Sequence, residues 1–219
     1  MKNIYAGLYA LIVFVLLQAC GSNKPVDREA VKEEMKAREI KKVSDSQITE
    51  KGIEIGNAIA REAQKTLKTN LLNAIKNDGV TEAISFCNAN ALKLVQELED
   101  SMNVSIFRVS QKWRNPKDEP DSLEALVLDA YQYNMDNGMD LKPSIQEEGK
   151  EVLLYTSPIK INNPLCLQCH GKVGDEVLNE THEKIISLYP NDNATGYTLG
   201  QLRGMWSIRI PKKEIVKQL

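Results

Sequence analysis

Two cysteines and a histidine lie close together in the C-terminal part of the chain. The segment Cys166-Leu167-Gln168-Cys169-His170 has the CxxCH spacing by which proteins attach c-type haem. In that chemistry each thiol adds to one vinyl group of the porphyrin, and the histidine that follows binds the iron. The 219 residues include only 4 cysteines and 2 histidines, so chance rarely produces this spacing. The sequence therefore predicts one covalently bound haem c, with His170 as an iron ligand.

Three other uses of these residues are weaker. A thioredoxin-like dithiol would leave His170 without a role, and the segment lacks the strand and helix pattern of such proteins. A zinc finger would use Cys169 and His182, but residues 186–188, where its second histidine belongs, are Ile-Ser-Leu. A disulfide between Cys166 and Cys169 would be redox-active rather than stabilising.

The N-terminus has the pattern of an export signal over residues 1–19. Lys2 precedes an apolar run over residues 4–17, which is too short to span a bilayer comfortably. The run ends in Leu-Gln-Ala-Cys20-Gly, which resembles the lipobox of bacterial lipoproteins, where the cysteine is lipidated. A short membrane anchor or an ordinary secretory signal is the alternative. We expect an exported, periplasm-facing protein, anchored through lipid on Cys20 to the inner or outer membrane of a bacterium.

The sequence does not decide which residue, if any, is the second iron ligand. The candidates are Cys87, His182, four methionines (Met102, Met135, Met139 and Met205) and no residue at all. His182 lies in a polar stretch typical of a surface, and methionines are equally typical of a core. Cys87 falls on the apolar stripe of an expected helix, and it has no disulfide partner if the other three cysteines are used as above. An inert buried thiol accounts for the same pattern.

Residues 20–45 form a charged tether whose middle is compatible with a helix, and residues 46–219 are expected to form one domain. Apolar spacing predicts a helix over residues 47–76, ended by Asn77-Asp78-Gly79, and a second helix over residues 81–100. The expected inward stripe of the first helix comprises Ile53, Ala60, Leu67, Leu71 and Ile75.

The later part of the domain has strand patterns. Residues 104–109, 152–161 and 205–210 are expected to be strands, and residues 122–133 a helix. The glycine-rich stretch between the last two strands is expected to consist of turns. These elements predict an α+β fold, with N-terminal helices laid against an antiparallel sheet.

Several separated segments together resemble the Tll0287-like haem domain, formerly a domain of unknown function. In chain order they are EAISFC (82–87), FRVS (107–110), RNP (114–116), CLQCHG (166–171), ATGY (194–197) and LRG (202–204). The resemblance covers residues 45–212. It implies a PAS-like fold, a single covalent haem, and iron held between His170 and Cys87. The family often has a second asparagine after the RNP segment; this chain has Asp118 there, so the role of that amide is not carried over.

The net charge and the expected iron ligands indicate which classes of function fit the sequence. The net charge of −2 gives no basic surplus for binding nucleic acid. Thiolate and imidazole ligands would fill both axial positions, which favours electron transfer or redox sensing over catalysis. Three arginines are candidates for pairing with haem propionates, namely Arg108, Arg114 and Arg203.

The expected partners are the membrane, through the lipid anchor, and a redox or signalling protein. The alternatives are a haem-based gas or redox sensor that signals through a separate partner, and a haem-free binding lipoprotein.

Overall fold

A computed structural model describes residues 27–37 and 43–219 of the chain. It divides into two units, Met1–Lys42 and Val43–Leu219. The expected signal segment, residues 1–19, and the expected lipidation site, Cys20, lie outside the described residues. Among the residues that are described, no helix is long and apolar enough to cross a membrane.

The described part of the first unit is helix α2, Arg28–Ala37, within the expected tether. Asp27 begins this helix because its carboxylate accepts hydrogen bonds from the backbone N–H groups of Glu29 and Ala30.

Helix α3, Asp45–Met102, opens the second unit and consists of two helices joined at Gly79. Ser44 caps its start, since the Ser44 hydroxyl accepts a hydrogen bond from the Gln47 backbone and the Gln47 side chain accepts one from the Ser44 backbone. Gly79 has φ 84° and ψ 171°, a conformation that side chains disfavour, so the chain changes direction there. The two predicted helices and the break at Gly79 are confirmed.

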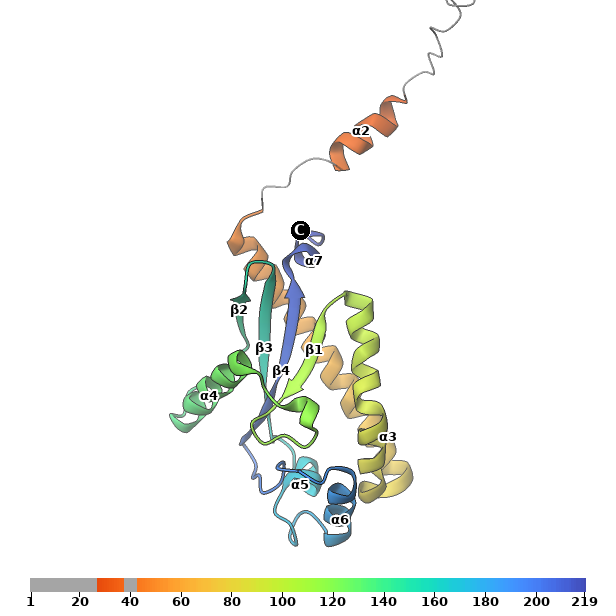
Figure 1. The fold of residues 1–219 in the computed structure, drawn as a ribbon, viewed down its shortest axis with the longest axis vertical. Coiled ribbons are helices and arrows are strands. Elements are labelled where there is room, and N and C mark those ends of the chain that lie inside the picture. Colours follow the sequence, from red (N-terminus) through yellow and green to blue (C-terminus); the bar gives the residue numbers. More distant parts are fainter. Residues whose placement is uncertain (1–26, 38–42) are drawn as a thin grey trace, which may run out of the picture. The chain divides into compact units, whose positions relative to one another are not determined.

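Four strands form one antiparallel sheet in the order β1-β4-β3-β2 (Figure 1). They are β1 (Ser105–Val109), β2 (Ser144–Glu148), β3 (Val152–Lys160) and β4 (Leu202–Pro211). The α+β prediction is therefore confirmed. Strand β2 was not predicted, because its sequence SIQEE contains one large apolar residue and owes its conformation to pairing with β3.

The first half of α3 packs against one face of the sheet. Its contact face includes two glycines, since a Cβ on Gly56 would lie 2.2 Å from the Tyr155 ring and one on Gly52 would lie 2.8 Å from Ile145. The predicted inward position of Ile53 is wrong, because that side chain is 39% exposed. The helix turns its glycines toward the sheet, which allows a closer approach than a stripe of large side chains.

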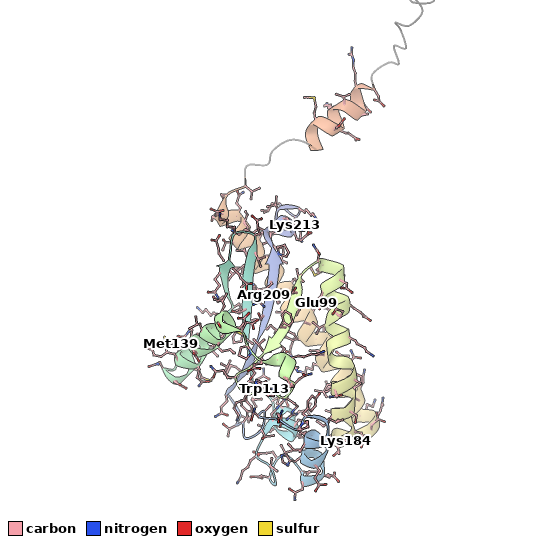
Figure 2. The ribbon with its side chains drawn as sticks, in the orientation of Figure 1. Glu99, Trp113, Met139, Lys184, Arg209 and Lys213 are labelled. Atoms are coloured by element: carbon pink, nitrogen blue, oxygen red, sulfur yellow. The ribbon has the colours of Figure 1, made fainter. Side chains whose placement is uncertain are left out.

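Helix α4, Ser122–Asp136, packs against β4 on the opposite face. Leu128 and Tyr131 of α4 join Val109 and Met205 in a buried cluster. Arg209, labelled in Figure 2, forms ion pairs with Asp121, which caps α4, with Glu124 of α4 and with Glu148 of β2. Both faces of the sheet are thus fixed to helices.

The remaining elements are short. They are the 3-10 helix η1 (Pro116–Asp118), α5 (Pro164–His170), α6 (Asn179–Leu188) and α7 (Lys212–Val216). The prediction that the stretch between β3 and β4 consists of turns is wrong where α5 and α6 lie. Asn163 caps α5 by accepting a hydrogen bond from the Leu165 backbone, and Pro164 occupies its first turn.

Candidate functional site

The CxxCH segment lies at one end of the sheet. Strand β1 ends and β4 begins at this end, next to α5, α6 and the bend in α3 (Figure 1). The loop after β1 reaches the same region, since the Trp113 carbonyl accepts a hydrogen bond from the Asn193 backbone (Figure 2). Helix α6 is tied to α3 by a 2.8 Å hydrogen bond between the Thr81 and Thr181 hydroxyls. Segments distant in sequence, from α3, the loop after β1 and α6, thus meet at this end of the sheet.

Helix α5 carries all three residues of the motif, and its two thiols pack in different directions. Cys166 contacts the buried cluster that contains Ala194 and Tyr197. Cys169 contacts a second cluster, which contains Ile84 of α3 and residues of α6. The described cysteines, Cys87, Cys166 and Cys169, form no disulfide.

Cys87 lies on the second half of α3, close to the motif. Burial raises the pKa of Cys169 to about 11; the charge of Arg114 opposes this rise, and a charge on the nearby Cys87 thiol would add to it. Burial also raises the pKa of Cys87, and the nearby charges of Arg108 and Arg114 partly oppose this rise. The structure thus brings together Cys87, Cys166, Cys169 and His170.

His170 is held in one orientation by a backbone group. Its Nδ1 atom lies 2.7 Å from the carbonyl oxygen of Ala194. Because a carbonyl only accepts hydrogen bonds, Nδ1 carries the proton and the lone pair is on Nε2. Burial, then the charges of Arg203 and Arg114, hold the pKa of His170 well below its usual value, so the ring is neutral. Metal-binding histidines have this state: a neutral ring with its second nitrogen hydrogen-bonded.

Arg114 fixes the segment that orients His170. Its Nε donates to the Asp192 carboxylate at 2.9 Å, and its Nη2 donates to the Cys169 carbonyl at 2.7 Å. Asp192 in turn accepts a hydrogen bond from the Ala194 backbone. The side chains of this ion pair are 11% and 1% exposed. Arg114 therefore links α5 to the loop that carries Ala194.

The two other candidate arginines have open hydrogen-bonding capacity. Arg203 donates from Nη1 to the Lys112 carbonyl at 3.2 Å, but its buried Nε has no partner within the described residues. Burial lowers the pKa of Arg203 to about 10. Arg108 forms no hydrogen bond or ion pair within the part of the chain that the structure describes. Both charges lower the pKa of His170, so both lie near its ring.

The other predicted ligand candidates lie elsewhere. Met205 is fully buried between the sheet and α4, Met102 ends α3 and packs against the core, Met135 lies near the end of α4, and Met139 is 45% exposed. His182 is half-buried on α6. Within the described ranges, no group of three or more His, Cys, Asp or Glu side chains is arranged to hold a metal ion.

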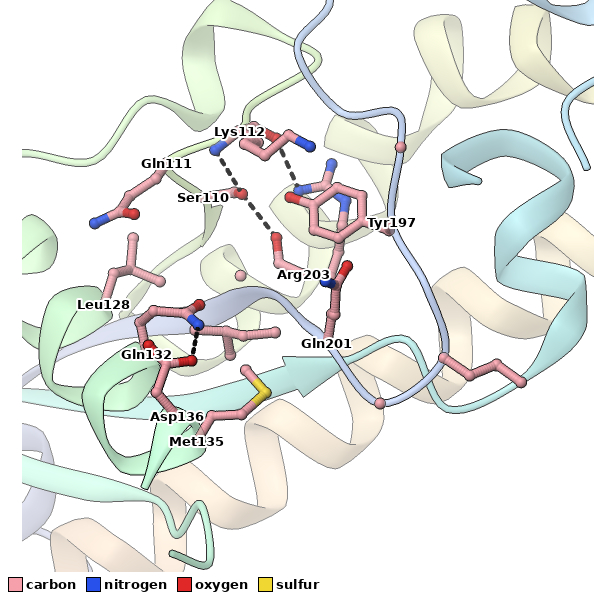
Figure 3. A pocket seen from close by; sticks show the side chains of 15 residues that line it. Ser110, Gln111, Lys112, Leu128, Gln132, Met135, Asp136, Tyr197, Gln201 and Arg203 are labelled. Atoms are coloured by element: carbon pink, nitrogen blue, oxygen red, sulfur yellow. Dashed lines mark hydrogen bonds between the residues drawn. The ribbon is translucent and has the colours of Figure 1, made fainter. Parts of the chain in front are cut away.

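A cavity of about 400 Å³ adjoins the site (Figure 3). Helix α4, the loop after β1 and residues 196–204 line it, whereas Cys166, Cys169 and His170 do not. Tyr197 borders both regions, because it lines the cavity and its ring meets the His170 ring edge-on at 6.2 Å between centroids. Lys112 and Arg203 lie over the Tyr197 ring at 4.4 and 5.5 Å.

Sequence reasoning missed Asp192, Ala194 and Tyr197. Ala194 acts through its backbone carbonyl, so its side chain gives no signal. Tyr197 belongs to the ATGY segment, which was noticed only as part of the family resemblance.

These features define a small α+β domain with a CxxCH helix at the end of its sheet and a bent helix that brings a further thiol to it. The model of the Tll0287-like family matches residues 27–211, and the chain belongs to this family. Among solved structures, the crystal structure of the cyanobacterial haem protein Tll0287 is similar, with a TM-score of 0.52 and 26% sequence identity. The match covers 72% of this chain and 94% of that chain. No curated protein matches the chain.

Proposed function

We propose that this domain binds one haem c through Cys166 and Cys169, that His170 and Cys87 hold its iron, and that the protein transfers electrons or senses redox state. The main support is the His170 ring, which is neutral, oriented by Ala194, and next to two unpaired thiols. Membership of the family that includes a cyanobacterial haem protein agrees with this proposal.

The residues at the site fit such a group. His170 offers an Nε2 lone pair without first losing a proton, and Cys87 would supply a negative charge near Arg108 and Arg114. A thiol that binds a metal loses its proton, so metal binding would overcome the burial that raises the pKa of Cys87. When bound, the haem supplies an iron that gains or loses one electron.

The unpaired arginines suggest where the haem carboxylates bind. Arg203 has a buried Nε without a partner, whereas the Arg108 side chain is exposed and has no ion pair within the described residues. A buried cation is stabilised by a carboxylate, and an arginine can bind one through two parallel hydrogen bonds. We therefore assign the propionates to Arg108 and Arg203. Arg114 already binds Asp192 and the Cys169 carbonyl, and is assigned to holding the loop.

This ligand pair favours electron transfer or redox sensing over catalysis. Two protein ligands leave no open position for a substrate, and an anionic thiolate stabilises the oxidised iron. The lipid anchor proposed at Cys20 would hold the domain at a bacterial membrane, facing the periplasm, where c-type haem is attached.

A gas or redox sensor that acts through a separate protein is the second candidate, and the bend in α3 favours it. Cys87 lies on the half of α3 that begins after Gly79 and is bound to α6 through Thr81. If Cys87 takes up a proton and leaves on reduction, this half-helix loses one attachment. The sensor predicts that the reduced protein binds carbon monoxide; a reduced protein that keeps a six-coordinate thiolate spectrum and binds no carbon monoxide contradicts it.

The covalent haem is tested by producing the full chain with c-type maturation machinery and staining a denaturing gel for haem peroxidase activity. We expect a stained band at the mature mass, and none for the Cys166→Ala/Cys169→Ala variant. The Cys87→Ala variant is the matched control, since it also removes a thiol but should keep the stain. An unstained wild-type band would contradict the proposal and favour a haem-free binding lipoprotein.

A further inference from the structure

The outward face of α4 exposes apolar side chains. Leu126 is 67% and Tyr133 is 64% exposed, and these residues lie seven positions apart, on the same side of the helix. Met139, which is 45% exposed, lies just beyond the end of α4 (Figure 2). Aromatic residues and methionine are enriched in protein interfaces, so these positions resemble the centre of a contact surface.

Acidic residues surround these apolar positions. Asp129 and Asp136 share the face of Leu126 and Tyr133, and Asp140 follows Met139. Residues 118–141 contain no lysine or arginine, although the whole chain has 28. None of these three aspartates forms an ion pair with a described residue, and their described contacts are hydrogen bonds from Gln111 to Asp129 and from Gln132 to Asp136.

This surface is connected to the candidate site through the cavity. Met135 and Asp136 of α4 line the cavity, and Tyr197 and Arg203 line it opposite them (Figure 3). The Tyr197 ring is 6.2 Å from that of His170, centroid to centroid. A partner on the outward face of α4 would therefore be separated from His170 by the helix itself, the cavity and the Tyr197 ring.

We propose that the α4 surface, formed by Leu126, Asp129, Tyr133, Asp136 and Met139, docks a redox protein that presents an apolar patch rimmed by lysine or arginine. The proposal rests on the electron-transfer function inferred above. The exposed aspartates favour a basic partner, because they attract a rim of lysine or arginine and speed association at low salt.

The same charges disfavour two other occupants. A second copy docked face to face through a two-fold axis would bring the aspartates of both copies together. An anionic lipid surface would repel them. The apolar patch is small, which suits the transient interfaces of electron-transfer complexes.

The test measures electron exchange between the reduced holoprotein and oxidised mitochondrial cytochrome c, a basic haem protein, by stopped flow. We expect the second-order rate constant to fall as salt increases. The Asp129→Lys/Asp136→Lys variant should lower it about tenfold or more at low salt and remove most of its salt dependence. The Tyr133→Ser variant should weaken binding to cytochrome c in calorimetry without changing the salt dependence.

The matched control is Glu50→Lys/Glu97→Lys, which makes the same change in net charge at exposed positions on α3. At about 0.1 M salt it should keep the rate constant within about twofold, because charges more than about 10 Å apart are largely screened there, whereas the α4 variant should still lower the rate constant. Equal effects of the two charge variants would overturn the docking surface. So would dimerisation of the wild type that depends on Tyr133, or binding of the wild type to anionic vesicles through the same residue.

Oxidation of the reduced holoprotein by ferricyanide tests the electron-transfer function independently of the α4 docking surface. If the wild type reacts with neither ferricyanide nor cytochrome c, the electron-transfer function itself fails. If it reacts with both and the α4 variants match the control, only the docking surface fails.

Discussion

The carbonyl oxygen of Ala194 accepts a 2.7 Å hydrogen bond from Nδ1 of His170. This contact sets which ring nitrogen carries the proton, and it fixes the ring relative to α5. The carbonyl is itself positioned by Asp192 and Arg114, which also binds the Cys169 carbonyl. The orientation of His170 therefore depends on a buried ion pair formed between two loops that are distant in sequence.

Replacing Arg114 tests the role of this ion pair. The Arg114→Met variant leaves the buried Asp192 carboxylate without its cation, and loss of one partner of such a pair costs about 3–5 kcal/mol. We expect a decrease of that order in the free energy of unfolding in urea. The control is Lys65→Met, which removes an exposed i,i+3 pair with Glu62 and should change stability by less than about 1 kcal/mol. Equal losses would show that Arg114 does not hold the loop.

Because α3 packs closely on the sheet, replacing Gly56 or Gly52 by alanine should lower the stability of the fold by different amounts. A Cβ on Gly56 would lie 2.2 Å from the Tyr155 ring, so Gly56→Ala should destabilise the fold by about 1–3 kcal/mol despite the better helix propensity of alanine. At Gly52 the nearest atoms are the ends of the flexible Ile145 and Leu153 side chains, and the cost should be smaller. Urea unfolding of both variants measures the difference. A Gly56→Ala protein as stable as the wild type would contradict the close contact.

Replacing Asp118 by a neutral residue is expected to stabilise the fold by an amount that depends on pH. Burial raises the pKa of its carboxyl above 3.8, and the charges of Arg108 and Arg203 oppose this rise only in part. The folded state therefore binds this proton more tightly than the unfolded state, so the stability it contributes is present at low pH and lost as pH rises through the folded-state pKa. Asp118→Asn is neutral at every pH.

We expect Asp118→Asn to unfold at a higher temperature than the wild type at pH 7, with the difference disappearing as the pH falls toward 4. Thermal unfolding between pH 4 and pH 8 measures this trend. An Asp118→Ala control also loses the charge but lacks the amide, so a shared pH trend identifies the charge as the cause. If Asp118→Asn and Asp118→Ala are both less stable than the wild type at pH 7, the prediction is contradicted.

Local sequence signals predicted much of the fold. The break in α3 was predictable because Asn77-Asp78-Gly79 is a helix stop that needs no tertiary contact. Helix α5 was expected to be turn because Gly171 and Gly174 follow it closely, although Asn163-Pro164 is a signal for the start of a helix. Strand β2 and the exposure of Ile53 depend on contacts with distant parts of the chain, which periodicity does not report.

The candidate site also contains residues that the sequence predicted and contacts that it did not. The residues of the CxxCH motif are adjacent in sequence and were predicted together. Helical phase made Cys87 one of several candidate ligands, the family resemblance favoured it over the others, and the structure places its thiol near Cys169. The contact of His170 with Ala194 joins residues 24 positions apart through a backbone atom, so no side-chain pattern predicts it.

The role of Cys87 as the second iron ligand is the central claim, and the spectrum of the oxidised holoprotein tests it most directly. We expect wild type to show the visible and electron paramagnetic resonance signals of low-spin iron with thiolate and imidazole ligands. The Cys87→Ala variant should keep its covalent haem, as judged by the stained gel, but lose the thiolate signals and become high-spin or gain a different ligand. A Cys87→Ala spectrum identical to that of the wild type would exclude Cys87 as the ligand and contradict the account.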